Sequence, residues 1–341
     1  MSAAPAEQAP LIVIAGPTGS GKSSLALSVA EALGAEIISA DSMQFYRGLE
    51  IGTAAPTPEE RRRVPHHFVS FLNPDEEMSA AAYQCAARER AARIRAAGRT
   101  AIAAGGSGMY IAALVDGLFD GPGRDPAIRA RLTGEAEEQG NAHLLERLRA
   151  VDPDYAATLT SENDVVRIVR ALEVYELAGR PYSALHREHR RAAESLRAVQ
   201  FALDYPDRAV LYQRINERVL RMVERGWVEE VEALVAAGYA PQIGRLKALG
   251  FREILACLRG EQSLDTAVAA TQQHHRRYAK RQLTWFRADP RIHWLPAGPG
   301  VSVTEQRDRL LAIVARIGAA DDGGAIHRYL QANAGPVKSD A

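Results

Sequence analysis

The chain lacks an excess of charge of either sign, has few cysteines, and contains no long apolar run. Its 42 basic and 42 acidic residues cancel, so any site for nucleic acid must be a local patch. The two cysteines, Cys85 and Cys257, lack metal-ligand spacing, which favours reduced, structural thiols. No run of about 18 apolar residues exists that could span a membrane, and residues 1–10 lack the pattern of a signal peptide. We therefore expect a cytoplasmic protein without a membrane partner.

The neighbouring histidines also lack the companions of a metal site. The pairs His66-His67 and His274-His275 have no carboxylate or cysteine at ligand spacing. We expect all four to be structural or surface residues.

What the sequence does contain is a phosphate loop. Residues 16–23 read Gly-Pro-Thr-Gly-Ser-Gly-Lys-Ser, between the apolar run 11–15 and an Ala/Leu-rich helical stretch, which is the context that this motif requires. Its glycines let backbone N–H groups turn toward one anion, and the dipole of the following helix adds positive potential. Lys22 supplies a charge for the terminal phosphate, and the Ser23 hydroxyl is placed to bind Mg²⁺. The chain is therefore expected to bind a polyphosphate.

Apolar runs alternate with helical patterns along most of the chain, which predicts a doubly wound α/β fold with a parallel sheet. The runs expected to form buried strands are residues 11–15, 36–39, 68–72, 100–104, 198–203 and 292–295. Between 118 and 195 the sequence is helical, charged and free of strand patterns. We therefore predict a P-loop NTPase-like core made of residues 10–117 and 196–318, an all-helical insertion at 118–195, and flexible tails at 1–9 and 319–341.

Six motifs together resemble the tRNA dimethylallyltransferase family, the tRNA isopentenyltransferases. Besides the phosphate loop they are Asp41–Ala54, which follows the second predicted strand, and Gly105–Tyr110, Arg167–Glu173, Gly250–Glu253 and Tyr278–Arg287. They occur in the family's order and extend over roughly residues 10–297. The phosphate loop is generic, whereas the other motifs together are specific.

The resemblance implies an activity and a set of catalytic residues. That family transfers a dimethylallyl group from dimethylallyl diphosphate to the exocyclic amine of the adenosine just 3′ of the tRNA anticodon. Asp41 and Ser107 are then catalytic, with Ser107 standing where the family usually has threonine. The phosphate loop and Mg²⁺ would stabilise the charge that develops on the diphosphate leaving group. The diphosphate-binding residues are Gly16, Thr18, Gly19, Ser20, Gly21, Lys22 and Ser23, and Ser23 also ligates the metal.

Two roles stay open at the catalytic residues. Asp41 is suited to take the proton that the adenine amine must lose, but it is also placed to order Mg²⁺ at the end of its strand. The Ser107 hydroxyl would bond an oxygen of the diphosphate, or it would cap the helix that follows.

Basic and aromatic residues are expected to hold the tRNA. Residues 271–287 include five basic residues and no acidic one, interleaved with three aromatics. Such aromatics either stack on the bases of RNA loops or belong to the core; we expect them mainly to pack the helix while the cations face RNA. Arg167 and Arg170 share one face of a helix predicted to end at Gly179, where they would contact tRNA or pair with Asp164 and Glu173.

The adenosine would be flipped into a pocket, entering from the tRNA side while the diphosphate enters from the opposite side. Ser42, Met43 and Gln44 would line the wall that reads the base. The complete tRNA-binding set implied by the resemblance is Ser42, Met43, Gln44, Arg129, Val166, Arg167, Arg170, Lys247, Gly250, Phe251, Arg252, Lys280, Arg281, Thr284, Trp285 and Arg287.

Two other functions fit part of the sequence. A P-loop kinase of a small metabolite would use ATP through residues 16–23 but leaves the segment from Asp41 to Ala54 without a purpose. An RNA-binding module without chemistry leaves Asp41 and Ser107 unexplained. We therefore predict tRNA dimethylallyl transfer by a monomer that binds the anticodon stem-loop and dimethylallyl diphosphate.

Overall fold

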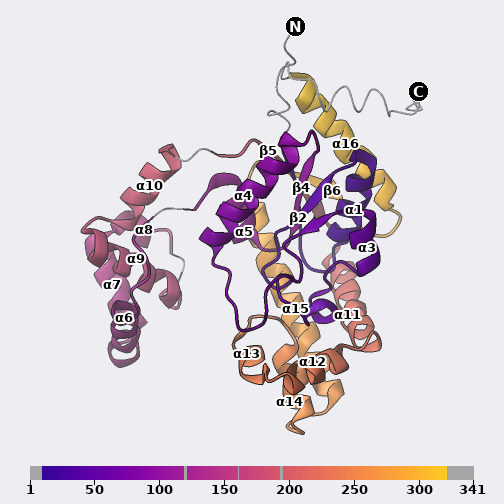
Figure 1. The fold of residues 1–341 in the computed structure, drawn as a ribbon. Helices are drawn as coiled ribbons and strands as arrows, with labels where there is room; N and C mark the ends of the chain where they lie inside the picture. Colours follow the sequence, from indigo (N-terminus) through magenta and orange to yellow (C-terminus); the bar gives the residue numbers. More distant parts are fainter. Residues whose placement is uncertain (1–9, 119–120, 160, 193–194, 321–341) are drawn as a thin grey trace. The chain divides into compact units, whose positions relative to one another are not determined.

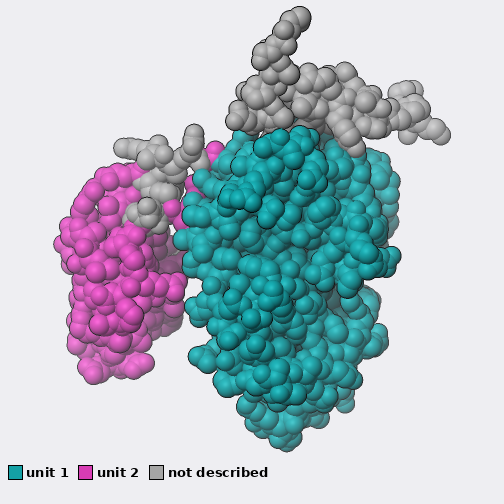
Figure 2. Space-filling view, in the orientation of Figure 1, with its two compact units in different colours: residues 1–115, 196–341 teal, residues 116–195 magenta. Residues whose placement is uncertain are grey.

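The structure is a computed structural model that describes residues 10–118, 121–159, 161–192 and 195–320. The chain divides into two compact units, residues 1–115 with 196–341, and residues 116–195 (Figure 2). The second unit starts two residues before the insertion expected from the sequence. Of the expected tails, residues 1–9 and 321–341 lie outside the described residues, while residues 319 and 320 end a helix, α16 (Val303–Ala320).

The first unit is built on a parallel sheet, as predicted. Within the described residues the sheet has six strands in the order β3-β2-β4-β1-β5-β6, and every neighbouring pair is parallel. Their bounds are β1 Leu11–Ala15, β2 Glu36–Ser39, β3 His66–His67, β4 Ala101–Gly105, β5 Ala198–Asp204 and β6 Ile292–Pro296. Because parallel strands end at the same edge, the loops after β1, β2 and β4 meet at one place.

Both faces of the sheet are covered, which is why its central strands are apolar without alternation. In β1, Leu11 and Val13 pack into one core and Ile12 and Ile14 into another, and all four are at most 1% exposed. Helices α1 (Lys22–Leu33) and α16 cover one face, and α4 (Ala80–Ala96) and α5 (Gly108–Asp116) cover the other (Figure 1).

The prediction of a third strand at residues 68–72 is wrong. The strand at this edge is β3, which contains only His66 and His67, paired with Ile37 and Ile38 of β2. The backbone of Phe68 (φ 60°) and of Ser70 (φ 50°) is left-handed, a conformation that interrupts an extended strand. Phe68, Phe71 and Leu72 instead lie in an irregular loop and pack against the core on the face of the sheet that α4 and α5 cover.

A group of helices extends the first unit beyond the sheet and positions the candidate site. Helices α2 (Glu50–Thr53) and α3 (Pro58–Arg63) follow β2, while the long helices α11 (Arg208–Glu224) and α15 (Leu264–Arg287) pack on each other. The shorter helices beside them are α12 Trp227–Ala236, α13 Ala240–Arg245 and α14 Phe251–Leu258. None of the helices in the described ranges is long and apolar enough to cross a membrane.

The second unit is helical in all of its described secondary structure. It contains α6 Pro126–Gln139, α7 Asn141–Val151, α8 Pro153–Ala156, α9 Val165–Ala178 and α10 Tyr182–Ala192. Leu132, Leu144, Leu148 and Ile168 are fully buried in a core of its own. The predicted end of α9 is confirmed, since Gly179 caps it in the left-handed conformation.

Candidate active site

The phosphate loop connects β1 to α1 and has the conformation that its glycines predict. Gly19 (φ 77°) and Gly21 (φ 97°) adopt left-handed backbone angles, and a Cβ at Gly19 would lie 2.8 Å from Cγ1 of Ile215. Gly21 is the N-terminal cap of α1 and provides no side chain to occupy the first N–H groups of that helix. These donors are therefore left for a ligand, which is the arrangement that binds phosphate.

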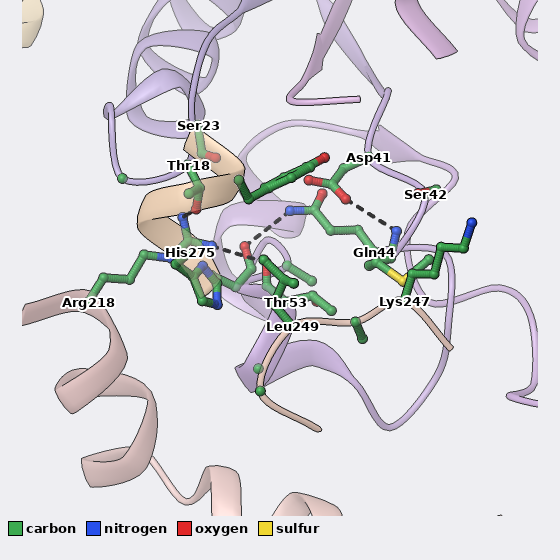
Figure 3. A pocket seen from close by; sticks show the side chains of 18 of the residues that line it. Thr18, Ser23, Asp41, Ser42, Gln44, Thr53, Arg218, Lys247, Leu249 and His275 are labelled. Atoms are coloured by element: carbon green, nitrogen blue, oxygen red, sulfur yellow. Dashed lines mark hydrogen bonds between the residues drawn. The ribbon is translucent and has the colours of Figure 1, made fainter. Parts of the chain in front are cut away.

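The loop leads into one cavity of about 940 Å³, formed wholly by the first unit (Figure 3). Its lining includes Thr18, Gly19, Gly21, Lys22 and Ser23 from the phosphate loop; Asp41, Ser42, Met43 and Gln44 from the segment after β2; Arg214, Arg218 and Arg221 from α11, with Arg225 directly after it; Lys247, Gly250 and Arg252; and His275, Tyr278, Arg281 and Gln282 from α15. Gly16, Ser20 and Ser107 are not among the lining residues.

Lys22 and Arg218 make the inner end of this cavity strongly basic. Lys22 is buried, and burial together with the positive charge of Arg218 lowers its pKa to about 8, although Asp41 opposes the shift. The Arg218 guanidinium donates to Oγ1 of Thr18 (3.0 Å) and to the carbonyl of Thr53 (3.3 Å). Two cations held this close together are suited to a ligand with more than one negative charge.

Asp41 lies at the carboxyl end of β2, held by the turn that follows it. Its Oδ1 accepts the N–H of Met43 (3.2 Å), and its carbonyl accepts the N–H of Gln44 (3.1 Å). The Gln44 amide accepts from Ser39 Oγ (3.0 Å) and donates to the carbonyl of Ala54 (3.2 Å). The segment 41–44 is therefore fixed at both ends, with the Asp41 side chain open to the cavity (Figure 3).

Ser107 lies between β4 and α5 and contacts the residue that follows Asp41. Its hydroxyl accepts the N–H of Ser42 (3.4 Å), and its carbonyl accepts the first N–H groups of α5. Tyr278 lines the cavity from α15, and burial followed by the charge of Asp41 raises its pKa to about 12. A phenol that stays protonated therefore stands beside Asp41.

Two basic residues of α11 that touch the phosphate loop were missed by sequence reasoning. The lining arginines Arg214, Arg218 and Arg221 of α11 follow each other at intervals of four and three residues, which places them on one helix face, and Arg225 follows directly after the helix. Besides Arg218, Arg214 donates from Nε to the carbonyl of Gly19 (3.2 Å). Their spacing is a signal that the sequence offered, but nothing local connects this helix to residues 16–23.

The four histidines have different surroundings. His275 is buried against the cavity, where burial and the charge of Arg218 lower its pKa to about 3, so the imidazole is neutral. His274 pairs with Glu253 (2.9 Å), His67 with Glu36, and Nδ1 of His66 lies 2.8 Å from the carbonyl of Val64. The described residues contain no group of three His, Cys, Asp or Glu side chains that would hold a metal ion.

The outer face of α15 presents most of the residues expected to bind RNA. Lys280, Arg281, Thr284 and Trp285 are exposed, and Arg281 also lines the cavity. The Trp285 ring is 46% exposed and rests on Gly108, where a Cβ would lie 2.3 Å from the ring. Arg287 is also exposed and pairs with Asp204 (3.2 Å).

The segment 247–252 divides between surface and core. Lys247 and Arg252 are exposed and line the cavity. Phe251 is fully buried and packs edge-on against Trp227, with ring centroids 5.5 Å apart. The Phe251 ring therefore belongs to the core, and the expected contact between Phe251 and tRNA stays a prediction. Gly250 (φ 87°) lets the chain pass Trp227, whose ring would lie 2.1 Å from a Cβ.

The remaining residues expected to contact tRNA belong to the second unit, where the three arginines among them form ion pairs. Arg129 pairs with both oxygens of Glu173 (2.8 and 2.9 Å), and Arg170 pairs with the same carboxylate (2.7 Å). Glu173 is 0% exposed; its burial alone would raise its pKa, but the hydrogen bonds from the two arginines lower it to about 2. Arg167 pairs with Asp164 (3.1 Å) and is half exposed, and Val166 beside it is 76% exposed. The ion pairs considered for Arg167 and Arg170 are thus present.

Comparison with known proteins connects this geometry to a family. The IPP transferase model matches residues 44–289. A tRNA dimethylallyltransferase of Geobacter sulfurreducens is 48% identical over 285 residues, which is 84% of this chain and 91% of that protein. The solved tRNA delta(2)-isopentenylpyrophosphate transferase of Staphylococcus epidermidis is 33% identical, with a TM-score of 0.65, and covers 90% of this chain and 99% of its own. A eukaryotic dimethylallyltransferase, solved in snapshots of its action on tRNA, is 26% identical, with a TM-score of 0.71. The match covers 97% of this chain and 81% of the eukaryotic chain. The chain therefore belongs to the IPP transferase family, the family of the tRNA dimethylallyltransferases.

Proposed function

We propose that this protein transfers a dimethylallyl group from dimethylallyl diphosphate to the exocyclic amine of the adenosine just 3′ of the tRNA anticodon. The observation that carries the proposal is one cavity that holds both a doubly basic phosphate site, Lys22 with Arg218, and a carboxylate, Asp41. Family membership supports the transfer of a prenyl group to tRNA. The identity of the donor and of the acceptor adenosine goes beyond what membership supplies.

The reaction needs a cation-rich site for its leaving group and an acceptor for one proton. The bond between C1 and oxygen of the donor breaks, and its electron pair leaves with the diphosphate, where Lys22 and Arg218 neutralise the growing charge. The lone pair of the adenine amine forms the new bond to C1. The proton that the amine loses passes to the carboxylate of Asp41, which faces the cavity.

The residues at the inner end fit a magnesium ion. The Ser23 hydroxyl and the Asp41 carboxylate line the same cavity, and oxygen ligands of this kind suit Mg²⁺ bound together with substrate phosphates. When bound, the ion would neutralise diphosphate charge. Asp41 then has two candidate roles, removing the proton and ordering the metal. The Ser107 hydroxyl, which accepts from Ser42, would position the segment after β2.

RNA would be held by the exposed cations of the first unit. Lys280 and Arg281 on α15, with Lys247 and Arg252 near the cavity, suit a phosphate backbone, and Trp285 offers a surface on which a base can stack. The target adenosine would be flipped into the cavity against the wall formed by Ser42, Met43 and Gln44. We assign the anticodon stem to the second unit, and we propose a cytoplasmic monomer.

The alternative functions explain less. A small-molecule kinase accounts for the phosphate loop alone, and the curated relatives at 46–48% identity are tRNA dimethylallyltransferases. An RNA-binding module without chemistry leaves the Asp41 carboxylate and the paired cations Lys22 and Arg218 without a use.

The test is mass analysis of nucleosides from unmodified tRNA incubated with the protein, Mg²⁺ and dimethylallyl diphosphate. We expect an adenosine heavier by one dimethylallyl group, nearly absent with Asp41→Ala and retained with the control Asp75→Ala, which removes an exposed carboxylate outside the cavity. Without modified adenosine from the unaltered protein, the proposal is wrong.

Asp41→Asn separates the two roles of the carboxylate. A variant whose activity returns as Mg²⁺ is raised assigns Asp41 to the metal. A variant that stays inactive at every Mg²⁺ concentration, while still binding inorganic diphosphate, assigns it to the proton.

A further inference from the structure

Gln282 of α15 connects two loops that are far apart in the sequence. Its side chain is buried, with Oε1 accepting the N–H of Thr18 (2.8 Å) and Nε2 donating to the carbonyl of Gly106 (2.8 Å). Thr18 belongs to the phosphate loop after β1, and Gly106 belongs to the loop between β4 and α5, which also contains Ser107. One amide therefore bridges the loops of two neighbouring strands.

The chemistry of the partners fixes the orientation of this amide. A backbone N–H only donates and a carbonyl only accepts, so the oxygen must face Thr18 and the nitrogen must face Gly106. The approach at Gly106 is also close, because a Cβ there would lie 2.2 Å from Nε2 of Gln282. Neither a carboxylate nor an apolar side chain of the same length can make both bonds.

Each end of the bridge continues to a residue of the proposed reaction. On one side, Thr18 accepts from Arg218 through Oγ1 (3.0 Å), which aims the guanidinium into the cavity. On the other side, Gly106 precedes Ser107, whose hydroxyl accepts from Ser42 next to Asp41. The distance between the phosphate site and the carboxylate thus depends on a side chain that belongs to neither.

The helix that carries Gln282 also carries the exposed residues assigned to RNA. Lys280 and Arg281 precede it, and Trp285 follows three residues later and rests on Gly108, the first residue of α5, directly after the loop that Gln282 holds. RNA bound on the outer face of α15 and diphosphate bound at the phosphate loop would therefore act on one rigid element.

We propose that Gln282 is a positioning residue that sets the spacing between the phosphate loop and the Asp41–Ser107 segment, and that it couples RNA binding on α15 to donor binding. The coupling half of this inference rests on the proposed function. The spacing half concerns diphosphate alone and is tested without RNA.

The test compares Gln282→Met, which keeps the length but removes both bonds, with Gln282→Glu, which keeps only the acceptor for Thr18. Gln272→Met is the matched control, because Gln272 lies on the same helix outside the cavity lining and donates to the carbonyl of Asn216 (3.2 Å). Calorimetry gives the Kd of inorganic diphosphate, of an anticodon stem-loop RNA in which a purine nucleoside without the exocyclic amine replaces the acceptor adenosine, and of dimethylallyl diphosphate with and without this unreactive RNA. Steady-state kinetics gives kcat and KM.

We expect both Gln282 variants to bind diphosphate at least tenfold more weakly and to lose at least tenfold in kcat, while the Kd for RNA changes less than twofold. RNA should tighten donor binding in the unaltered protein and in Gln272→Met, and much less in the Gln282 variants. Should Gln282→Met fail to fold, Gln282→Glu alone decides. Diphosphate affinity and kcat that stay within twofold of the unaltered protein overturn the proposal, as does a donor Kd in the unaltered protein that RNA leaves unchanged. An unaltered protein that modifies no tRNA refutes the proposed function instead, and the diphosphate measurement still decides the spacing.

Discussion

Replacing Glu173 with glutamine is expected to loosen the helical insertion more than any surface substitution would. The Glu173 carboxylate is 0% exposed and accepts from Arg129 Nε and Nη2 (2.8 and 2.9 Å), from Arg170 Nη1 (2.7 Å) and from the N–H of Asp125 (2.8 Å). Glutamine has nearly the same shape but carries no charge. It also replaces one acceptor by an NH₂ group that faces an arginine, so two cations lose their counterion.

Two independent figures give the magnitude. Removing one member of a buried ion pair typically costs about 3–5 kcal/mol. The pKa of Glu173 is lowered from 4.5 to about 2, and at about 1.4 kcal/mol for each pH unit this difference corresponds to about 3 kcal/mol. Since the pKa is lower in the folded state, the stabilisation is complete above pH 4.5 and is lost as the pH falls through about 2.

All three tryptophans lie in the other unit, so tryptophan fluorescence does not report on the unfolding of residues 116–195. The assay must therefore follow these residues directly. Amide hydrogen exchange of peptides from α6 and α9, measured by mass spectrometry, meets this need. We expect protection there to fall by about 100-fold in Glu173→Gln, which corresponds to about 3 kcal/mol, with tryptophan fluorescence unfolding unchanged.

Glu176→Gln is the matched control on the same helix. Glu176 pairs with Arg131 and Arg147 but is partly exposed, and such pairs contribute at most about 1 kcal/mol. Equal losses of protection in the two variants, or a loss below tenfold in Glu173→Gln, would show that the buried carboxylate does not hold these helices together.

Two further predictions concern the first unit. Because the pKa of Lys22 is about 8 and its cationic form binds the anion, the affinity for inorganic diphosphate should fall as the pH rises from 7 to 9. Lys22→Met should bind weakly with a flatter profile in calorimetry, and an equally steep profile in the variant would assign the titration elsewhere. Gly52→Ala should lower the melting temperature by several degrees, because its Cβ would lie 2.1 Å from Nε1 of Trp227 and overpacking costs about 1–3 kcal/mol. Gly134→Ala, a helical glycine with nothing within 4 Å, is the control and should leave the melting temperature unchanged or raise it.

The parts of the structure that could be predicted from sequence are those in which the signal is local. The phosphate loop is eight consecutive residues, and β1 and β4 are short apolar runs between helical patterns. The same inference from an apolar run to a strand failed at residues 68–72. Apolar side chains indicate burial but do not specify backbone angles, and φ is positive at Phe68 and Ser70.

The parts of the candidate site that sequence reasoning missed depend on long-range contacts. Arg218 and Gln282 meet the same threonine, Thr18, from positions 200 and 264 residues away. No spacing rule connects such positions, and composition marks neither residue. For Arg170 the ion pair with Glu173 is a local i, i+3 pair that the sequence indicated, whereas Arg129 reaches the same carboxylate from another helix.

The point where the insertion leaves the first unit has a consequence for modularity. Val115 lies in the last turn of α5 and Leu196 lies two residues before β5, and the N–H of Leu196 donates to the carbonyl of Val115 (2.8 Å). The two ends of the insertion therefore meet at one hydrogen-bonded point of the first unit, and residues 116–195 form a separate unit with a core of their own. Because this bond holds the chain just before β5, we expect that lengthening or shortening residues 116–195 leaves the register of β5 on β1 unchanged. On this reasoning, residues 116–195 can vary in length while the sheet that supports the candidate site keeps its strand pairing.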